Sequence, residues 1–149
     1  MIKARENKIP LKQSVMFLLF SNGKFLLEKR KDPDGSYFNY SIIPAGKLEE
    51  NELPEEGLRR EILEETGVVP TKFTMLDTFE DVTPKGHHYL VNAYLITEFE
   101  GSVVNREPYK VDHEWVTLEE TRNILKFANS RYVFLLAERA LNAEEQKKD

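Results

Sequence analysis

Three glutamates stand at helical spacing near the middle of this 149-residue chain: Glu61, Glu64 and Glu65. At about 100° per residue they fall within roughly one third of the circumference of a helix. Carboxylates this close repel each other, which raises their proton affinity and destabilises the helix. A hard divalent cation relieves both effects, and magnesium prefers such oxygen ligands. The spacing therefore predicts a magnesium site, at which manganese could substitute.

Such a site suits the attack of water on a phosphoanhydride. The cation neutralises phosphate charge, orients or activates water, and stabilises the leaving oxygen. Glu61, Glu64 and Glu65 are therefore the predicted metal ligands and catalytic residues, and the pattern leaves open whether Glu61 is a ligand or the general base. A Glu-rich helix alone is usually a solvated surface, so the surrounding residues must decide between the two interpretations.

The helix that positions these glutamates is predicted over Pro54–Thr66. Proline suits the first helical position, and Gly67 suits the C-terminal cap. Gly57 lies inside the helix, at a cost of about 1 kcal/mol relative to alanine, and close packing of the helix on a sheet would explain it. Leu58 and Ile62 lie beside the glutamates and should face the core.

The rest of the chain combines strand signals with two further helix signals. Strands are expected at 15–20, 25–30, 40–44, 72–82 and 88–99, and a further extended segment should end at 114–116. A capping box at 117–120 opens a second helix. A third is expected over 131–142, with a face formed by Tyr132, Val133, Leu136, Ala137 and Ala140. This order favours a mixed sheet with helices on both faces.

The composition is that of one globular domain covering residues 1–149, with 1–12 and 144–149 peripheral and the charged tail frayed. Hydrophobic residues make up 40% of the chain, and Trp115 is expected in the core. A net charge of -5 argues against bulk binding to nucleic acid. No apolar run approaches the length of a membrane span, so no membrane association and a cytoplasmic location are expected. There are no cysteines, which excludes thiol chemistry.

The stretch from Gly46 to Val68 resembles the Nudix box, G-x5-E-x7-R-E-U-x-E-E-x-G-U, in which U is aliphatic. Every fixed position is filled, by Gly46, Glu52, Arg60, Glu61, Ile62, Glu64, Glu65, Gly67 and Val68. The chain is therefore similar to MutT-like Nudix hydrolases. The resemblance implies an α/β/α sandwich with a mixed β-sheet between the helices. Many Nudix-like proteins are dimers, so a homodimer is expected by analogy alone, and the sequence itself does not indicate the oligomeric state.

The resemblance assigns roles within the box. Glu52 and Arg60 would pair and fix the loop against the helix, and Gly46 and Gly67 would be structural. The backbone carbonyl of Ala45 would join the metal shell, although alanine stands here where the family more often has glycine. Outside the box, the family often carries an acidic residue, which here could be Glu107, Asp112 or Glu114 acting as an additional acid or base.

Candidate substrate-binding residues lie near the box. Arg30 could reach a phosphate from a strand end, and Lys47 follows the glycine loop. Phe38, Tyr40 and Tyr89 could stack on a base, although a core or loop position would explain each of them. Substrate choice is expected in the loops 32–39, 81–88 and 101–110.

The resemblance implies a small-molecule nucleotide substrate, a nucleoside diphosphate linked to another group. We expect a (deoxy)nucleoside triphosphate first, oxidised forms included. The alternatives are a pyrophosphatase of ADP-ribose, sugar nucleotides or dinucleotides, and a non-catalytic nucleotide-sensing module. The complete box argues against the sensing module, and the acidic chain argues against an enzyme acting on RNA ends.

Overall fold

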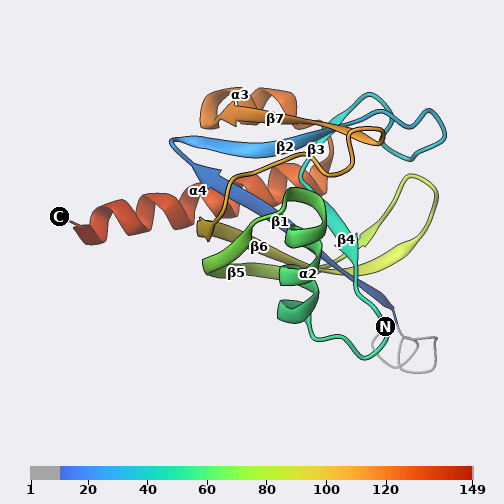
Figure 1. The fold of residues 1–149 in the computed structure, drawn as a ribbon, viewed down its shortest axis with the longest axis horizontal. Coiled ribbons are helices and arrows are strands. Elements are labelled where there is room, and N and C mark those ends of the chain that lie inside the picture. Colours follow the sequence, from blue (N-terminus) through green and yellow to red (C-terminus); the bar gives the residue numbers. More distant parts are fainter. Residues whose placement is uncertain (1–10, 149) are drawn as a thin grey trace.

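Two layers of helices enclose one mixed sheet in the computed structural model, which describes residues 11–148 (Figure 1). The strands are β1 (Lys12–Ser21), β2 (Lys24–Arg30), β3 (Ser41–Ile42), β4 (Ala45–Lys47), β5 (Val69–Val82), β6 (His88–Glu100) and β7 (Val111–Thr117). The helices are α2 (Pro54–Thr66), α3 (Leu118–Ile124) and α4 (Ala128–Lys148). The expected α/β/α sandwich is confirmed.

Strand β1 connects the parts of the sheet. Its residues Lys12 to Leu19 pair in parallel with β6, and Ser14 to Met16 pair with β4 on the other side. Only its end reaches β2, through an antiparallel turn in which Asn22 and Gly23 have φ values of 52° and 76°. Such values are the reason that Asn-Gly suits a two-residue hairpin. The pairing of β4 with β1 places the loop that precedes α2 directly against β1.

Both faces of β1 are buried, and successive residues point to opposite layers. One face packs under α2 in a cluster that includes Val15, Phe17, Leu19, Leu58 and Ile62. The other packs under α4 in a cluster that includes Met16, Leu18, Val133, Phe134 and Ala137. Leu58 and Ile62 are therefore core residues, as predicted, and Glu65 on the glutamate arc of α2 is buried as well.

Helix α2 begins and ends as the sequence predicts. Its last turn is closed by Gly67, which has φ 77° and donates its N–H to the carbonyl of Leu63. The explanation expected for Gly57 is wrong, because the helix meets its own preceding loop there rather than the sheet. A Cβ on Gly57 would lie 2.1 Å from the Cδ2 atom of Leu48. The loop and the helix are thus in direct contact.

Several other expectations need correction. Lys12 belongs to β1 and is not peripheral, while residues 1–10 lie outside the described residues. The expected frayed tail is wrong for 144–148, which continue α4. Trp115 is 39% exposed because it lies on an edge strand, β7, and points to the face opposite that of its buried neighbour Val116. No helix within residues 11–148 is long and apolar enough to span a membrane.

The third helix also differs from its prediction. It begins at Ala128 rather than at residue 131, and it extends through Lys148. Tyr132 is exposed, and its hydroxyl donates to Asp77 on β5 instead of packing in the core. Phe134 takes the expected core position beside Val133. Val133 and Ala137 of the predicted face are buried and Ala140 packs against the same core cluster, so Tyr132 is the residue of that face that the structure places at the surface.

Candidate active site

Arg60 joins the loop to the glutamates of α2. Its Nε and Nη2 atoms each donate to Glu52 at 2.8 Å, and Nη2 also donates to the backbone oxygen of Lys47 at 3.0 Å. Its Nη1 atom donates to Glu61 at 2.9 Å and to Glu64 at 3.2 Å. The hydrogen bonds from Arg60 lower the pKa of Glu52 to about 2. The pairing of Glu52 with Arg60 that the resemblance implies is present.

The loop lies so close to the helix that a side chain at position 46 would displace the Glu61 carboxylate. A Cβ there would stand 2.1 Å from the carboxylate carbon of Glu61. Glu52 holds the other end of the loop, because its Oε1 atom accepts the backbone N–H of Glu49 at 2.9 Å. Ala45 and Gly46 belong to β4 and pair with Met16 and Val15 of β1. The backbone around the site is thus fixed from two sides.

The three glutamates have different surroundings. The side chain of Glu64 is 57% exposed and that of Glu61 is 14% exposed. Glu65 is buried, and its Oε2 atom has no hydrogen-bond partner within the described part of the chain. Burial, followed by the nearby charge of Glu28, raises the pKa of Glu65 to about 11. Burial raises the pKa of Glu61 as well, although Arg60 opposes this.

Glu28, on β2, was not recognised from the sequence. It is 1% exposed and lies within hydrogen-bonding reach of Glu65. Its pKa is raised by burial, an effect that Glu65 and Arg30 oppose. A single glutamate after three apolar residues, 25–27, was the only signal available, and such a residue is usually solvent-facing.

The donor set fits a divalent cation. It consists of carboxylates, it includes a buried oxygen without a partner, and it lies behind a glycine that leaves room for Glu61. Among residues 11–148, no three acidic or imidazole groups already stand close enough to hold an ion. The guanidinium of Arg60 bonds to Glu61 and Glu64 in this arrangement. These two carboxylates would have to turn toward an ion for all three glutamates to bind it.

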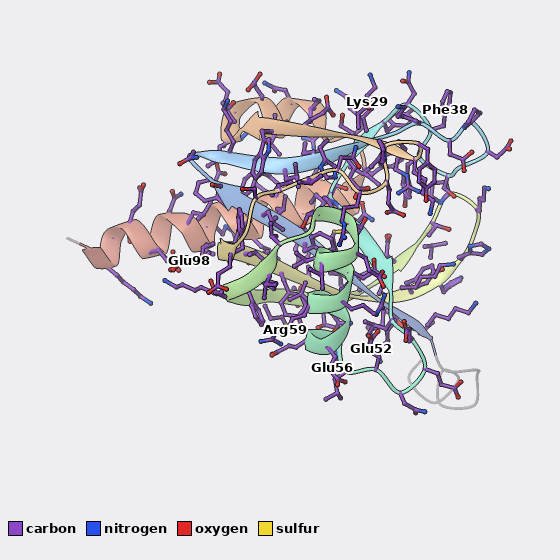
Figure 2. All side chains as sticks on the ribbon, viewed as in Figure 1. Lys29, Phe38, Glu52, Glu56, Arg59 and Glu98 are labelled. Atoms are coloured by element: carbon purple, nitrogen blue, oxygen red, sulfur yellow. The ribbon has the colours of Figure 1, made fainter. Side chains whose placement is uncertain are left out.

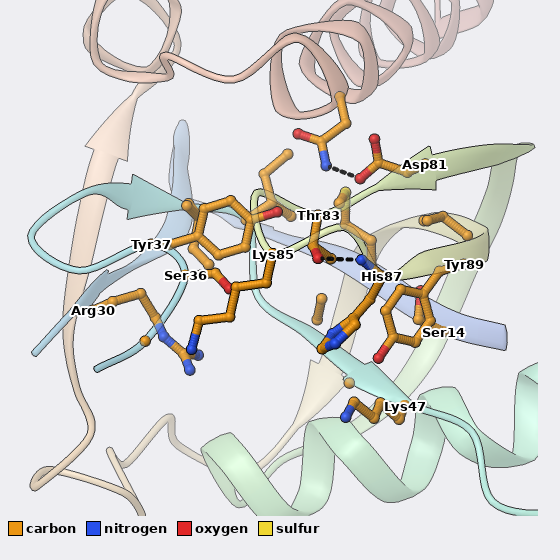
Figure 3. Close-up of a pocket in the computed structure, with 18 of the residues that line it drawn as sticks. Ser14, Arg30, Ser36, Tyr37, Lys47, Asp81, Thr83, Lys85, His87 and Tyr89 are labelled. Atoms are coloured by element: carbon orange, nitrogen blue, oxygen red, sulfur yellow. Dashed lines mark hydrogen bonds between the residues drawn. The ribbon is translucent and has the colours of Figure 1, made fainter. Parts of the chain in front are cut away.

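A cavity of about 450 Å³ opens beside the glycine loop (Figure 3). Its lining includes Ala45, Gly46 and Lys47 of β4 and the apolar side chains of Met16, Ile42, Ile43, Tyr89 and Val91. Three cationic side chains also line it: Arg30, Lys47 and Lys85. Lys85 and Arg30 reach into the same side of the cavity in Figure 3. This side is suited to phosphate groups.

The opposite side of the cavity lies at the start of α4. Asn129 there donates from Nδ2 to Asp81 of β5 at 2.7 Å, as drawn in Figure 3. Tyr37 lies next to this pair, and its ring packs edge-on against Phe127, with centroids 4.8 Å apart. Burial, followed by the charge of Asp81, raises the pKa of Tyr37. An aromatic ring, a carboxylate and an amide are groups that can bind a base.

Two of the three expected substrate loops line the cavity. The loop 32–39 meets the hairpin 81–88 where Lys85 donates to the backbone oxygen of Asp34 at 2.7 Å. The third, 101–110, contributes no lining residue. It packs on the end of α2, where Arg106 donates from its Nη1 atom to the carbonyl of Leu63 at 3.0 Å.

Only some of the residues predicted to bind substrate line the cavity. Arg30, Lys47 and Tyr89 line the cavity, whereas Phe38 and Tyr40 do not. Phe38 is exposed on the outer side of its loop (Figure 2). Tyr40 packs against Phe127 with ring centroids 5.0 Å apart. Tyr37, Asp81 and Lys85 lie in the expected loops but were not singled out, and Asn129 was missed, because only tertiary contacts bring it to the cavity.

The three candidates for an additional acid or base differ in their positions and interaction partners. Glu107 lies near enough to raise the pKa of both Glu28 and Glu65. Asp112 is exposed and forms an ion pair with Lys31 at 3.4 Å. Glu114 accepts a hydrogen bond from the hydroxyl of Ser41 at 2.6 Å. Of the three, Glu107 has the placement suited to the site.

Known proteins resemble this chain in both sequence and fold. An 8-oxo-dGTP diphosphatase of Proteus vulgaris is 39% identical over 65 residues, which are 44% of this chain and 57% of that protein. An ADP-ribose pyrophosphatase of Bacillus subtilis (strain 168) is 35% identical over 94 residues, which are 62% of this chain and 49% of that protein. The chain thus spans about half the length of these curated relatives.

The fold comparison and the family model agree. The structure of a MutT Nudix hydrolase from Burkholderia pseudomallei superposes with a TM-score of 0.73 at 23% identity, covering 86% of this chain and 98% of that one. The model of the Nudix domain matches residues 10–137. This match includes the whole box, the loop before it and the strands that line the cavity. The chain belongs to the Nudix family.

Proposed function

We propose that the protein is a magnesium-dependent pyrophosphohydrolase that cleaves a phosphoanhydride bond in a nucleoside diphosphate linked to another group. The observation that carries the proposal is the position of the cavity. Cationic side chains and the Gly46 loop line it, and that loop lies against the Glu61 carboxylate of α2. A nucleotide in the cavity would therefore hold its phosphates beside the proposed metal ligands. The curated relatives, a diphosphatase and a pyrophosphatase of nucleotides, support the same reaction class.

The residues have distinct roles in this reaction. Glu61, Glu64 and Glu65 would hold magnesium, which supplies charge neutralisation and activates water. Arg60 and Glu52 keep the loop fixed, so that Gly46 leaves space for Glu61. Arg30, Lys47 and Lys85 would bind the phosphates and offset their charge. The apolar wall around Ile42 and Val91 would exclude water from one side of the substrate.

The cavity also suggests how a nucleotide is oriented. The phosphates would lie at the cationic side, next to the loop before α2. The base would then lie toward α4, beside Tyr37 and the polar pair of Asp81 and Asn129, which line that side of the cavity. This orientation suits a (deoxy)nucleoside triphosphate, including an oxidised one. Hydrolysis of such a triphosphate would release a nucleoside monophosphate and pyrophosphate.

A second candidate substrate class is ADP-ribose and related diphosphates, which the Bacillus subtilis relative favours. Such a substrate carries a second sugar in place of the terminal phosphate. Lys85 would contribute more to binding a triphosphate than to binding ADP-ribose, because only a triphosphate presents a highly charged terminus. The substrate class can therefore be tested together with the reaction.

The test is a substrate panel assayed with magnesium. It contains the common and 8-oxo (deoxy)nucleoside triphosphates, ADP-ribose, NADH, diadenosine polyphosphates and sugar nucleotides. Released nucleoside monophosphate, pyrophosphate and phosphate are scored for the wild type and for Glu64→Gln. Turnover of the triphosphates that disappears in the variant is the expected result. Absence of turnover across the panel by a protein that binds magnesium would contradict the proposal and favour the sensing module.

A further inference from the structure

A buried carboxylate outside the box lies against the proposed metal site. Glu28 lies on β2, opposite Ile42 of β3 and His113 of β7, and is 1% exposed. Burying a charged carboxylate is strongly unfavourable unless a cation or strong hydrogen bonds compensate it. An ordinary strand position at this depth would hold an apolar residue. The burial of Glu28 therefore indicates that a positively charged group compensates it at this site.

The described cations compensate Glu28 poorly. Arg30 is its ion-pair partner, but their closest atoms, Nη1 and Oε2, are 3.5 Å apart, and the Arg30 side chain is 32% exposed. Arg30 also lines the cavity, where its charge is available to a ligand. The other charged groups that act on Glu28 are acidic: Glu65 lies within hydrogen-bonding reach, and Glu107 is near. Negative charge therefore exceeds positive charge around Glu28.

A second observation points to a ligand at the same place. The Oε2 atom of Glu65 is buried without a hydrogen-bond partner within residues 11–148. An orphaned carboxylate oxygen is rare in protein interiors, because leaving it unpaired costs its full desolvation energy. Glu65 and Glu28 come from α2 and β2, which lie in different layers of the fold. Two elements thus bring two buried, undercompensated carboxylates into contact.

We propose that Glu28 is a further ligand of the divalent cation, binding from the sheet the ion that Glu65 binds from α2. The inference rests on the proposed metal-dependent function and extends its donor set beyond the box. A cation between the two side chains would compensate Glu28 and give the orphaned oxygen of Glu65 a partner. Glu28 would also link the metal to the cavity, because its other neighbour is Arg30.

The competing explanation is a shared proton between Glu28 and Glu65, with the metal bound elsewhere on α2. The two explanations predict opposite effects of Glu28→Gln. If Glu28 is a ligand, the variant loses an anionic donor and binds the cation more weakly. If it only shares a proton, the glutamine amide donates to Glu65, holds it ionised, and leaves metal affinity unchanged or increased.

The experiment is a titration of the metal-free protein with Mn²⁺, followed by electron paramagnetic resonance of the free ion. Glu28→Gln is compared with the wild type and with Glu119→Gln, which removes one charge from an exposed position on α3. Circular dichroism confirms that each variant is folded. Glu28→Asp, which keeps the charge but shortens the side chain, serves as a second variant if the glutamine does not fold.

We expect Glu28→Gln to weaken Mn²⁺ binding by at least about tenfold, the loss typical of disturbed metal sites, while Glu119→Gln changes it little. Glu28→Asp should weaken it as well. Wild-type affinity in both Glu28 variants, or tighter binding in Glu28→Gln, would overturn the inference while leaving the proposed function intact. A wild type that binds no Mn²⁺ would overturn both.

Discussion

Gly46 and Glu61 are in contact across the boundary between the loop and α2, with no room between them for a methyl group. A Cβ on Gly46 would stand 2.1 Å from the Glu61 carboxylate carbon and 2.2 Å from its Oε2 atom. The contact places a proposed metal ligand beside the backbone that lines the cavity. The glycine is therefore needed for the position of a carboxylate, and not for its own φ angle.

Gly46→Ala should displace the Glu61 carboxylate and reduce kcat/KM by about tenfold or more, since small shifts of catalytic groups have effects of this size. The protein should stay folded, because the far end of a glutamate side chain can move. Steady-state kinetics with the best substrate of the panel measures the loss. Gly23→Ala is the control: φ is 76° there and no atom lies within 4 Å of the added methyl. It should cost about 1 kcal/mol of stability and no activity. Equal activity in the Gly46 variant would mean that Glu61 tolerates displacement.

Magnesium should raise the melting temperature of the protein, because a ligand that binds only the native state stabilises it. At a concentration about one hundred times the Kd the stabilisation is about 2.7 kcal/mol. The double variant Glu64→Gln, Glu65→Gln should lose this response. Differential scanning fluorimetry with and without magnesium measures both. If the double variant responds as the wild type does, the ligand assignment on α2 is wrong.

Glu52 should make the stability of the protein depend on pH in the acid range. Its pKa is lowered from 4.5 to about 2, chiefly by hydrogen bonds from Arg60. A lowered folded-state pKa means that the stabilisation is present above pH 4.5 and is lost as the pH falls toward about 2. Glu52→Gln should therefore destabilise the protein near neutral pH by about 1–2 kcal/mol, with the difference from the wild type vanishing in acid.

Urea unfolding of both proteins across the acid range measures this difference. Glu55→Gln is the matched control, because Glu55 also pairs with an arginine on α2 but at 3.8 Å and at an exposed site. Its effect should stay below about 0.5 kcal/mol at every pH. A Glu52 effect that persists unchanged at the acid end would show that packing, and not the charge, is responsible.

Asp81 should contribute to the choice of base. A carboxylate only accepts hydrogen bonds, and the guanine edge presents N–H donors. Asp81→Asn should therefore raise KM for dGTP by about tenfold or more, while dITP, which lacks the amino group, should be affected less. The value of kcat should change little, because the base is far from the reacting phosphates. Asp77→Asn is the control on the same strand, since Asp77 accepts from Tyr132 instead of lining the cavity. Equal losses for dGTP and dITP would contradict direct recognition of the amino group.

The box and its helix were readable from the sequence because their information is local. Helix periodicity places Glu61, Glu64 and Glu65 on one arc, and the cap at Gly67 ends the helix where predicted. The strand pattern of β1 and the order of elements were enough to predict the sandwich, since apolar runs and turns have their own short-range signals. Element ends were less accurate, as at Lys12 and Ala128, because packing of neighbouring elements extends them.

The substrate cavity was decided by tertiary structure. Tyr37, Asp81 and Asn129 come from a loop, a strand end and a helix that are far apart in the chain, and no local pattern relates them. Glu28 shows the same limit: its residue type and strand position indicated a surface charge, whereas its burial against Glu65 follows from α2 packing over the sheet. Local sequence determines which elements form and which chemistry they carry. The long-range contacts that pair the strands and pack α2 against the sheet determine which of those groups share one site.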